Sequence, residues 1–289
     1  MRIDPERLLK HAARIARATA TYALSQSSRR GDVARHLAHD VKLRLDIECQ
    51  ALAKKLIRAE FPRHRILGEE DKDSTTTPLP DFSFATEAGN MDADYSDILW
   101  IVDPLDGTVN FNHGIPLWCC SVAVAVRNQI VAGAVHIPLL NRCYAARAGG
   151  KATCNGKPIN VSNRNRLPDS IVVTGMDRNL GPRVPPFAMF NSIAGKVQRA
   201  RVLGSAAVDL CLVADGAADA YLEAGIYIWD IAAGGLIVQQ AGGRLEQLAR
   251  FPGNRLCFLA SNGMIHKAIK TSVSPVLKAA TKVGPGARQ

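Results

Sequence analysis

The spacing of apolar residues predicts two helices near the start of the chain. Residues 5–25 are amphipathic and lack the apolar core and cleavage site of a secretory signal, so we expect a helix of the mature protein. A second helix is expected over about 42–60, where four apolar residues recur on one helical face, namely Leu45, Cys49, Leu52 and Leu56. The following "FPRH" ends this helix, because proline cannot continue the helical hydrogen bonds.

The middle of the chain shows the shorter pattern of β-strands. "RILGEED" reads as a short strand that runs into acids, and "DILWIVD" reads as a buried strand. "CCSVAVAVRNQIVAGAVHIP" predicts two strands joined at Arg127-Asn128, and "RCYAARAGGKATCNGKPINVS" continues as strand, turn and a further Asn-Gly turn. Residues 98–161 are therefore expected to form a mainly antiparallel sheet.

After about residue 162 the pattern alternates between helix and strand. Strands are expected at "SIVVTGM", "ADAYLEA", "RLEQL" and "RLCFLAS". Helices are expected at "FAMFNSIAGKV", from about 204 in "RVLGSAAVDLCLVADG", in "WDIAAGGLIVQQAGG" and over 262–280, with a loop at 180–189 and a loose tail "VGPGARQ". We therefore predict an α/β fold of two intimate halves, residues 1–161 and residues 162–289.

A polar, acidic segment at residues 71–97 interrupts the first half. It contains seven acids and a single lysine, and its length is typical of a loop with a mobile function. A lid beside the neighbouring acids and a tolerated surface insertion both remain open.

Composition narrows the class of protein. The chain has 289 residues, 47% of them hydrophobic and 21% charged, which is typical of one large globular domain or two intimate halves. It contains no run of about 18 apolar residues, so no membrane span is expected. The seven cysteines are scattered without a CxxC pair, which argues against disulfides or a thiolate zinc site and fits a reducing cytoplasm. His36 and His39 read as a plain helix surface rather than a metal-binding pair.

The net charge of +10 permits a nucleic-acid partner or an anionic small molecule. The basic residues are not concentrated in one block, nucleic-acid-binding motifs are absent, and aromatic residues make up only 6%. We therefore expect a solvated basic surface and no nucleic-acid or membrane partner.

Four acidic side chains stand where apolar segments end. These are Glu69, Asp103, Asp106 and Asp230. Each has an ordinary explanation by itself: Asp106-Gly107 suits a turn, Asp230 suits the N-cap of a helix that starts at Ile231, and Glu69 suits a solvated loop. Together they are the oxygen ligands that hard divalent cations prefer.

The segment "DPLDGTVNF" adds a means of holding an anion. Gly107 lets the backbone approach a ligand closely, and a helix that begins at about Gly107–Thr108 directs free N–H groups at it. Carboxylates for a metal and N–H groups for a phosphate in one peptide suit metal-assisted hydrolysis of a phosphate ester.

"GEED", "WIVDPLDGTVNF" and "YLEAGIYIWDIAAGGLIVQQAGG", in that order, resemble the inositol monophosphatase family of Mg²⁺-dependent, lithium-sensitive phosphatases related to fructose-1,6-bisphosphatase. "GSAAVDLCLVADGAADAY" and "CNGKPINVS" support the resemblance, which runs from about residue 40 to about residue 262. It implies a layered αβαβα sandwich, a homodimer and two or three bound Mg²⁺ ions.

The resemblance also implies a role for individual residues. The metal ligands would be Glu69, Asp103, the Leu105 carbonyl, Asp106 and, from the second half, Asp230. Thr108 and Glu69 would orient the attacking water, and Asp46 would serve a weaker metal position and hydrogen-bond Thr108. Substrate contacts would come from six residues: Asp106, Gly107, Thr108, Ala206, Glu223 and Asp230.

This chain departs from the family pattern before the second helix. Where many members have a Lys-Ser…Asp-Leu-Val-Thr run, it reads "HDVKLRLD", of which only Asp46 matches securely. Of the residues in this run, Asp46 alone supports the third metal position.

The expected activity is hydrolysis of myo-inositol-1-phosphate to inositol and phosphate. The context of Glu223 favours inositol phosphates, but fructose-1,6-bisphosphate, a 3′-phosphoadenosine nucleotide, NADP(H) and histidinol phosphate remain alternatives. A non-catalytic member that binds RNA or a protein is a further alternative.

Overall fold

The computed structural model describes residues 3–36, 41–72, 74–87, 93–175 and 187–281. Both N-terminal helices are confirmed: α1 covers Pro5–Ser25 and α2 covers Arg44–Glu60. Asp4 caps α1 by accepting a hydrogen bond from Glu6 N at 3.0 Å, and Pro5 suits the first helical turn. A short hairpin, β1 (Val33–His36) and β2 (Val41–Leu43), precedes α2.

An eight-stranded sheet forms the centre of the first half, in the order β10-β9-β8-β7-β6-β5-β3 with β4 beside β7. Its strands are β3 (Arg65–Gly68), β4 (Ser83–Phe84), β5 (Ile98–Asp106), β6 (Cys119–Val126), β7 (Gln129–Ile137), β8 (Arg142–Arg147), β9 (Thr153–Cys154) and β10 (Lys157–Pro158). Pairing is antiparallel from β5 to β10, which confirms the predicted sheet. β3 pairs in parallel with β5, and β4 pairs in parallel with β7.

A five-stranded sheet, ordered β12-β11-β13-β15-β14, forms the second half. Its strands are β11 (Ile171–Thr174), β12 (Arg199–Arg201), β13 (Ala220–Ile226), β14 (Arg244–Arg250) and β15 (Leu256–Ser261). The helices are α4 (Ala188–Ala194), α5 (Ala206–Ala214), α6 (Ile228–Gln240) and α7 (His266–Thr281). The sequence pattern did not predict β12, because Arg-Ala-Arg carries no apolar signal.

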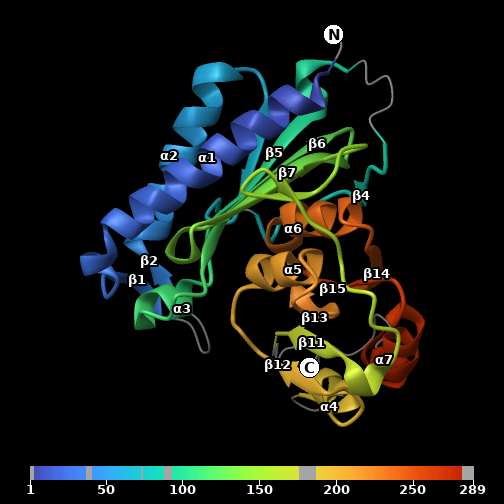
Figure 1. Ribbon diagram of the computed structural model, residues 1–289. Helices are drawn as coiled ribbons and strands as arrows, with labels where there is room; N and C mark the ends of the chain where they lie inside the picture. The colour runs from blue at the N-terminus through green and yellow to red at the C-terminus, as the bar shows by residue number, and fades with distance from the viewer. Residues whose placement is uncertain (1–2, 37–40, 73, 88–92, 176–186, 282–289) are drawn as a thin grey trace.

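The elements stack in five layers (Figure 1). Helices α1 and α2 cover one face of the large sheet, α5 and α6 fill the space between the sheets, and α4 and α7 cover the outer face of the small sheet. This is the predicted αβαβα sandwich. Because helices cover both faces of the large sheet, β6 is buried at every position instead of alternating.

Small residues allow the middle layer to lie close to the large sheet. A Cβ added to Gly133 on β7 would stand 2.8 Å from Cα of Ala233 on α6, so only glycine fits there. Helices α5 and α6 thus share a core with the first half. The boundary between the two halves at residue 162 remains a prediction.

Several predicted boundaries move. The last helix begins at His266 rather than at residue 262, after Gly263 with a φ of 83°. His36 lies in β1 and not on a helix, and His39 lies outside the described residues. The predicted loop at 180–189 is described only from Phe187, and the predicted tail lies outside the described residues.

Part of the acidic segment is fastened to the second half. We call residues 74–84 the strap. Asn254 donates to the carbonyls of Ser74 (3.2 Å) and Thr77 (2.7 Å) and accepts from Leu79 N (3.0 Å). Phe84 packs against Phe258 with ring centroids 5.8 Å apart. The strap therefore joins the end of β3 to the edge of the small sheet, while residues 73 and 88–92 of the predicted loop lie outside the described part.

No helix among the described residues is both long and apolar enough to cross a membrane.

Candidate active site

A bulge in β5 brings Asp103 and Asp106 to the same face of the large sheet. Residues three apart in a regular strand point to opposite faces. Here Asp103 pairs with Ser121 and Asp106 with Cys119, so three steps on β5 match two steps on β6. Cys119 and Ser121 share a face, and directly paired residues share it too. Both carboxylates therefore face the layer of α5 and α6.

The start of α5 holds Asp106. Its Oδ2 accepts hydrogen bonds from Ser205 Oγ and Ala207 N, both at 2.7 Å, and Cys119 Sγ lies 3.7 Å away. Ser205 is also the N-cap of α5. These contacts fix the orientation of the Asp106 carboxylate.

The turn after β5 places Gly107 and Thr108 at the start of a short helix, α3 (Thr108–His113). Gly107 has a φ of 91°, a left-handed conformation that favours glycine. The first helical hydrogen bond runs from Phe111 N to the Gly107 carbonyl at 2.9 Å. The N–H groups of the preceding residues therefore belong to the first turn, where the helix itself supplies no acceptor. The predicted helix start at Gly107–Thr108 is confirmed.

The side chain of Thr108 differs from the expectation. Thr108 Oγ1 donates to the Leu105 carbonyl at 3.0 Å, and Leu105 N donates to Asp103 Oδ1, also at 3.0 Å. The predicted hydrogen bond between Asp46 and Thr108 is not formed. Asp46 Oδ2 accepts instead from Leu43 N at 2.8 Å, and Asp46 Oδ1 is buried without a partner. The three-residue turn from Leu105 supplies Thr108 with a nearer acceptor.

Asp230 occupies the third position of α6 and not the N-cap. The helix starts at Ile228, three residues earlier than the N-cap interpretation required. Its Oδ2 accepts from Tyr227 N at 2.7 Å, so one oxygen satisfies the backbone ahead of the helix.

Glu69 follows β3, next to the end of β5. Its N–H donates to the Val102 carbonyl at 3.1 Å, which continues the parallel pairing beside Asp103. Ser74 Oγ donates to the Glu69 carbonyl at 2.9 Å, so the strap begins directly at this acid. Lys42 Nζ lies 4.0 Å from Glu69 Oε1.

The electrostatics show that these carboxylates share one environment. Burial raises the pKa of Asp103 well above its ordinary value, and the charges of Glu69, Asp106 and Asp230 raise it further. Burial likewise raises the pKa of Asp230, with Glu69 and Asp106 contributing. The pKa of Asp106 is raised by burial against the lowering effect of its donors Ser205 and Ala207.

Asp46 belongs to the same environment from the side of α2. Burial, followed by the charges of Glu69 and Glu70, raises the pKa of Asp46 to about 8, while the N–H of Leu43 opposes the shift. Acids from different helices and strands that raise one another's pKa are typical of functional sites.

The donor set fits a hard divalent cation. Five carboxylates and the Leu105 carbonyl supply only oxygen, and Asp46 Oδ1 is a buried oxygen without a hydrogen bond. Within the part of the chain that the structure describes, no three acidic, histidine or cysteine side chains already stand in a coordinating arrangement.

Two further predicted substrate contacts, Ala206 and Glu223, lie on α5 and β13 of the second half. Ala206 is the first residue of α5 and is nearly buried, and its N–H lies beside Asp106. Glu223 lies on β13, where Tyr221 Oη donates to its Oε2 at 2.8 Å. A Cβ added to Gly175 would stand 1.8 Å from Glu223 Oε1, so this glycine makes room for the carboxylate.

Two residues of the site were not predicted. Ser205 could have been found, because a serine ahead of "AAVD" is a typical N-cap signal. Lys42 had no such signal, since its approach to Glu69 depends on the β1–β2 hairpin.

Comparison with known proteins agrees with this geometry. Residues 4–278 match the family model described as "Inositol monophosphatase family". The chain is 36% identical over 204 residues to the inositol-1-monophosphatase of Mesorhizobium japonicum, covering 69% of this chain and 77% of that protein. It is 31% identical over 243 residues to human inositol monophosphatase 1, with coverages of 82% and 83%. The Nus factor SuhB of Pasteurella multocida is 34% identical over 239 residues, with the same coverages.

Solved structures show the same architecture. An inositol monophosphatase from Anabaena superposes with a TM-score of 0.75 at 28% identity, covering 93% of this chain and 96% of that chain. The Thermotoga maritima IMPase gives a TM-score of 0.75 at 28% identity, with coverages of 95% and 99%.

Proposed function

The chain belongs to the inositol monophosphatase family, a family of phosphatases, and on that basis we propose that it is a Mg²⁺-dependent phosphomonoesterase that hydrolyses inositol monophosphate. One observation carries the proposal: the bulge in β5 turns Asp103 and Asp106 to the same face, toward the layer that contributes Asp230. Glu69 completes the acidic centre from the end of β3.

We assign the cation ligands to Glu69, Asp103, the Leu105 carbonyl, Asp106 and Asp230. Bound Mg²⁺ ions would lower the pKa of a water molecule and neutralise charge on the phosphate. Two or three ions are compatible with this set of oxygens, and magnesium remains an assignment from donor chemistry.

The chain's own groups would position the reactants. The N–H groups of Gly107 and Thr108, at the start of α3, would hold phosphate oxygens. Thr108 Oγ1 would turn from the Leu105 carbonyl to the attacking water, with Glu69 accepting from that water. Asp46 would support Thr108 after this rearrangement, through the Oδ1 that has no partner.

Substrate recognition would come from the second half. Glu223 would accept hydrogen bonds from ring hydroxyls, and Ala206 would contact the substrate through its backbone. Fructose-1,6-bisphosphate, a 3′-phosphoadenosine nucleotide, NADP(H) and histidinol phosphate remain alternative substrates, because the acidic centre acts on the phosphate and does not identify the alcohol.

The test is a substrate panel at fixed Mg²⁺, ranked by kcat/KM, on the wild type and two variants. Asp103→Asn should lose at least ~100-fold in kcat/KM while its unfolding curve stays close to that of the wild type. Asp97→Asn is the matched control, because Asp97 precedes the same strand but pairs with exposed Arg127. Near-normal hydrolysis by Asp103→Asn would refute the assignment, and a preferred substrate other than inositol phosphate would change only the alcohol.

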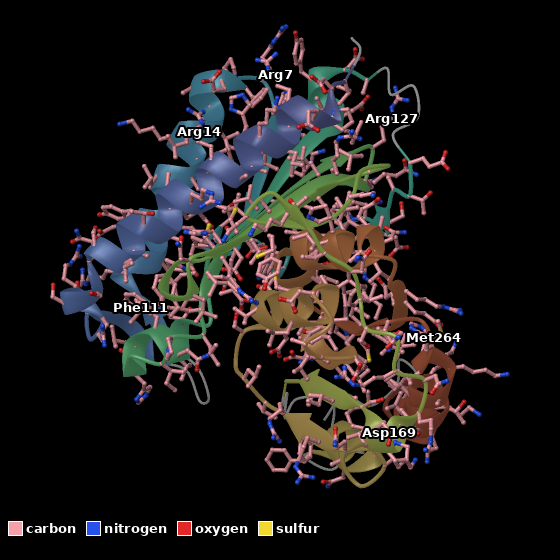
Figure 2. All side chains as sticks on the ribbon, in the orientation of Figure 1. Arg7, Arg14, Phe111, Arg127, Asp169 and Met264 are labelled. Atoms are coloured by element: carbon pink, nitrogen blue, oxygen red, sulfur yellow. The ribbon has the colours of Figure 1, made fainter. Side chains whose placement is uncertain are left out.

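A second candidate is a non-catalytic role with RNA or protein, because a similar protein carries the name Nus factor SuhB. Basic side chains such as Arg7, Arg14 and Arg127 extend at the end of the molecule that carries α1 and the β6–β7 hairpin (Figure 2). Each predicted main ligand is nevertheless present, which favours catalysis. Absence of hydrolysis for every ester of the panel in the presence of Mg²⁺ would favour the second candidate.

Two further assignments remain proposals, the first from the family resemblance and the second from the scattered cysteines. We assign a homodimer and a cytoplasmic location, and sedimentation velocity and cell fractionation test them.

A further inference from the structure

The acidic centre consists of Glu69, Asp103, Asp106 and Asp230, with Asp46 and Glu70 beside Glu69. Lys42 contributes a positive charge at the end formed by these last three acids. It lies on β2, and its side chain is 33% exposed. Its Nζ donates to both oxygens of Glu70, at 2.8 and 2.9 Å, and lies 4.0 Å from Glu69 Oε1. The side chain of Glu70 is only 8% exposed, so this ion pair is partly shielded from water.

The acids around Lys42 are held in place by α2. Glu70 N donates to Gln50 Oε1 at 2.9 Å, and the Gln50 amide fills the space beside Gly68, where a Cβ would stand 2.1 Å from Oε1. β2 leads directly into α2, which brings Asp46 near the same lysine. The Lys42 ammonium therefore lies near Asp46 on α2 and near Glu69 and Glu70, which directly follow β3.

The position of Lys42 disfavours a divalent cation at the carboxylates that Lys42 approaches. The ammonium is a compact point charge, and a divalent ion bound by the same carboxylates would be repelled at short range. Glu69 also belongs to the group with Asp103, Asp106 and Asp230, whereas Glu70 and Asp46 lie on the lysine side. The two ends of the acidic centre thus differ in their capacity for a metal ion.

We propose that Lys42 serves as a built-in cation of this site: its ammonium takes the Asp46–Glu69–Glu70 end and keeps a further divalent ion from binding there. The chain then binds two divalent ions through Asp103, Asp106 and Asp230 with Glu69. This inference rests on the proposed function, because it assumes that the acidic centre binds divalent cations.

The experiment counts Mn²⁺ bound to the full chain, from the electron paramagnetic resonance signal of free Mn²⁺ during a titration. The variants are K42Q, K42R and a matched control, K54Q. Lys54 is a partly buried lysine on α2 that pairs with Asp71, so K54Q removes the same charge close to the acidic segment but outside the acidic centre.

The expected result is two Mn²⁺ ions per wild-type chain. K42Q should bind one additional ion, or bind its weakest ion at least ~10-fold more tightly, because the nearby positive charge is gone. K42R and K54Q should titrate like the wild type. K42M provides a second neutral variant, and thermal unfolding of each protein checks that it is folded.

Three results would overturn the inference. A third ion on the wild type would show that the lysine excludes nothing. Equal titrations of wild type, K42Q and K42M would show that Lys42 has no influence, and an equal change in K54Q would show a general effect of net charge. These leave the proposed function intact, whereas a wild type that binds no Mn²⁺ would overturn both.

Discussion

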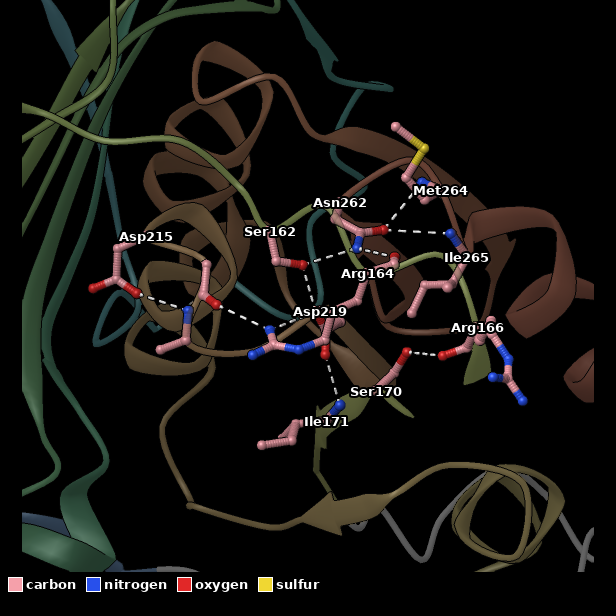
Figure 3. Close-up of polar contacts among 12 residues, drawn as sticks. Ser162, Arg164, Arg166, Ser170, Ile171, Asp215, Asp219, Asn262, Met264 and Ile265 are labelled. Atoms are coloured by element: carbon pink, nitrogen blue, oxygen red, sulfur yellow. Dashed lines mark hydrogen bonds and ion pairs between the residues drawn. The ribbon is translucent and has the colours of Figure 1, made fainter. Parts of the chain in front are cut away.

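Asp219 is the residue whose removal should most clearly weaken the junction between the two halves. Its side chain is fully buried and accepts from Ile171 N at 2.7 Å, from Arg164 Nη1 at 3.2 Å and from Ser162 Oγ (Figure 3). Its backbone carbonyl accepts from Asn262 N at 2.9 Å. Asp219 thus joins the segment that leaves the large sheet, at Ser162 and Arg164, to the start of β11 through its carboxylate and to the residue after β15 through its backbone carbonyl.

The size of the effect follows from these contacts. The bonds from Ile171 and Ser162 are buried and go to a carboxylate, so each is worth about 1.5–3 kcal/mol. Arg164 is 45% exposed, so its ion pair contributes less than ~1 kcal/mol. Asp219→Ala also leaves the Ile171 N–H without its acceptor, and we expect a loss of about 3–5 kcal/mol in the free energy of unfolding.

Urea unfolding followed by far-UV circular dichroism measures this loss. Arg164→Ala should cost less than ~1 kcal/mol. Asp169→Ala is the control, because Asp169 is 55% exposed and lies 3.6 Å from Arg166. If Asp219→Ala were no more destabilising than Asp169→Ala, the junction would not depend on the buried carboxylate and the reasoning would be wrong.

Three further changes test the site and the core. Gly175→Ala should displace the carboxylate of Glu223 and raise KM for inositol phosphate ~10-fold while leaving p-nitrophenyl phosphate, which has no ring hydroxyls, unaffected; equal changes for both substrates would contradict the role of Glu223. Gly107→Ala should lose about 1–2 kcal/mol of stability in urea unfolding, because its φ of 91° is strained for alanine, and an unchanged midpoint would contradict this. Burial, and then the nearby arginines, lowers the pKa of His64 from 6.5 to about 4, so the unfolded chain binds a proton that the native chain does not between these values. Stability should therefore fall by roughly 2–3 kcal/mol as the pH drops from 6.5 to 4, and His64→Gln, which keeps an acceptor for Trp100 Nε1, should lose that part of the slope.

Local patterns were sufficient for most of the elements. Helix α1 was predicted with its observed bounds, because its periodicity, its cap and its proline all lie within the segment itself. The β6–β7 hairpin was predicted for the same reason, since the turn at Arg127-Asn128 is a local feature. β12 was missed because it gains its place only by pairing with β11.

The start of α6 shows the limit of local reasoning. A single aspartate after an apolar strand suggested an N-cap at Asp230, but the helix begins at Ile228 and Asp230 accepts from Tyr227 N. Both arrangements satisfy the same free N–H groups, so the sequence pattern alone does not separate them.

The sequence by itself determined which acidic residues are candidates for the chemistry and which family the chain resembles, because the motifs are short and their order is specific. Only the tertiary structure decided how those residues face one another. Asp103 and Asp106 would point to opposite faces in a regular strand, and their pairing with Ser121 and Cys119 across a bulge turns them the same way. The approach of Lys42 to Glu69 likewise depends on a hairpin and a strand end far apart in sequence. Pairing register and the contacts between distant elements are set by the packing of the whole fold, and no local run of residues contains that information.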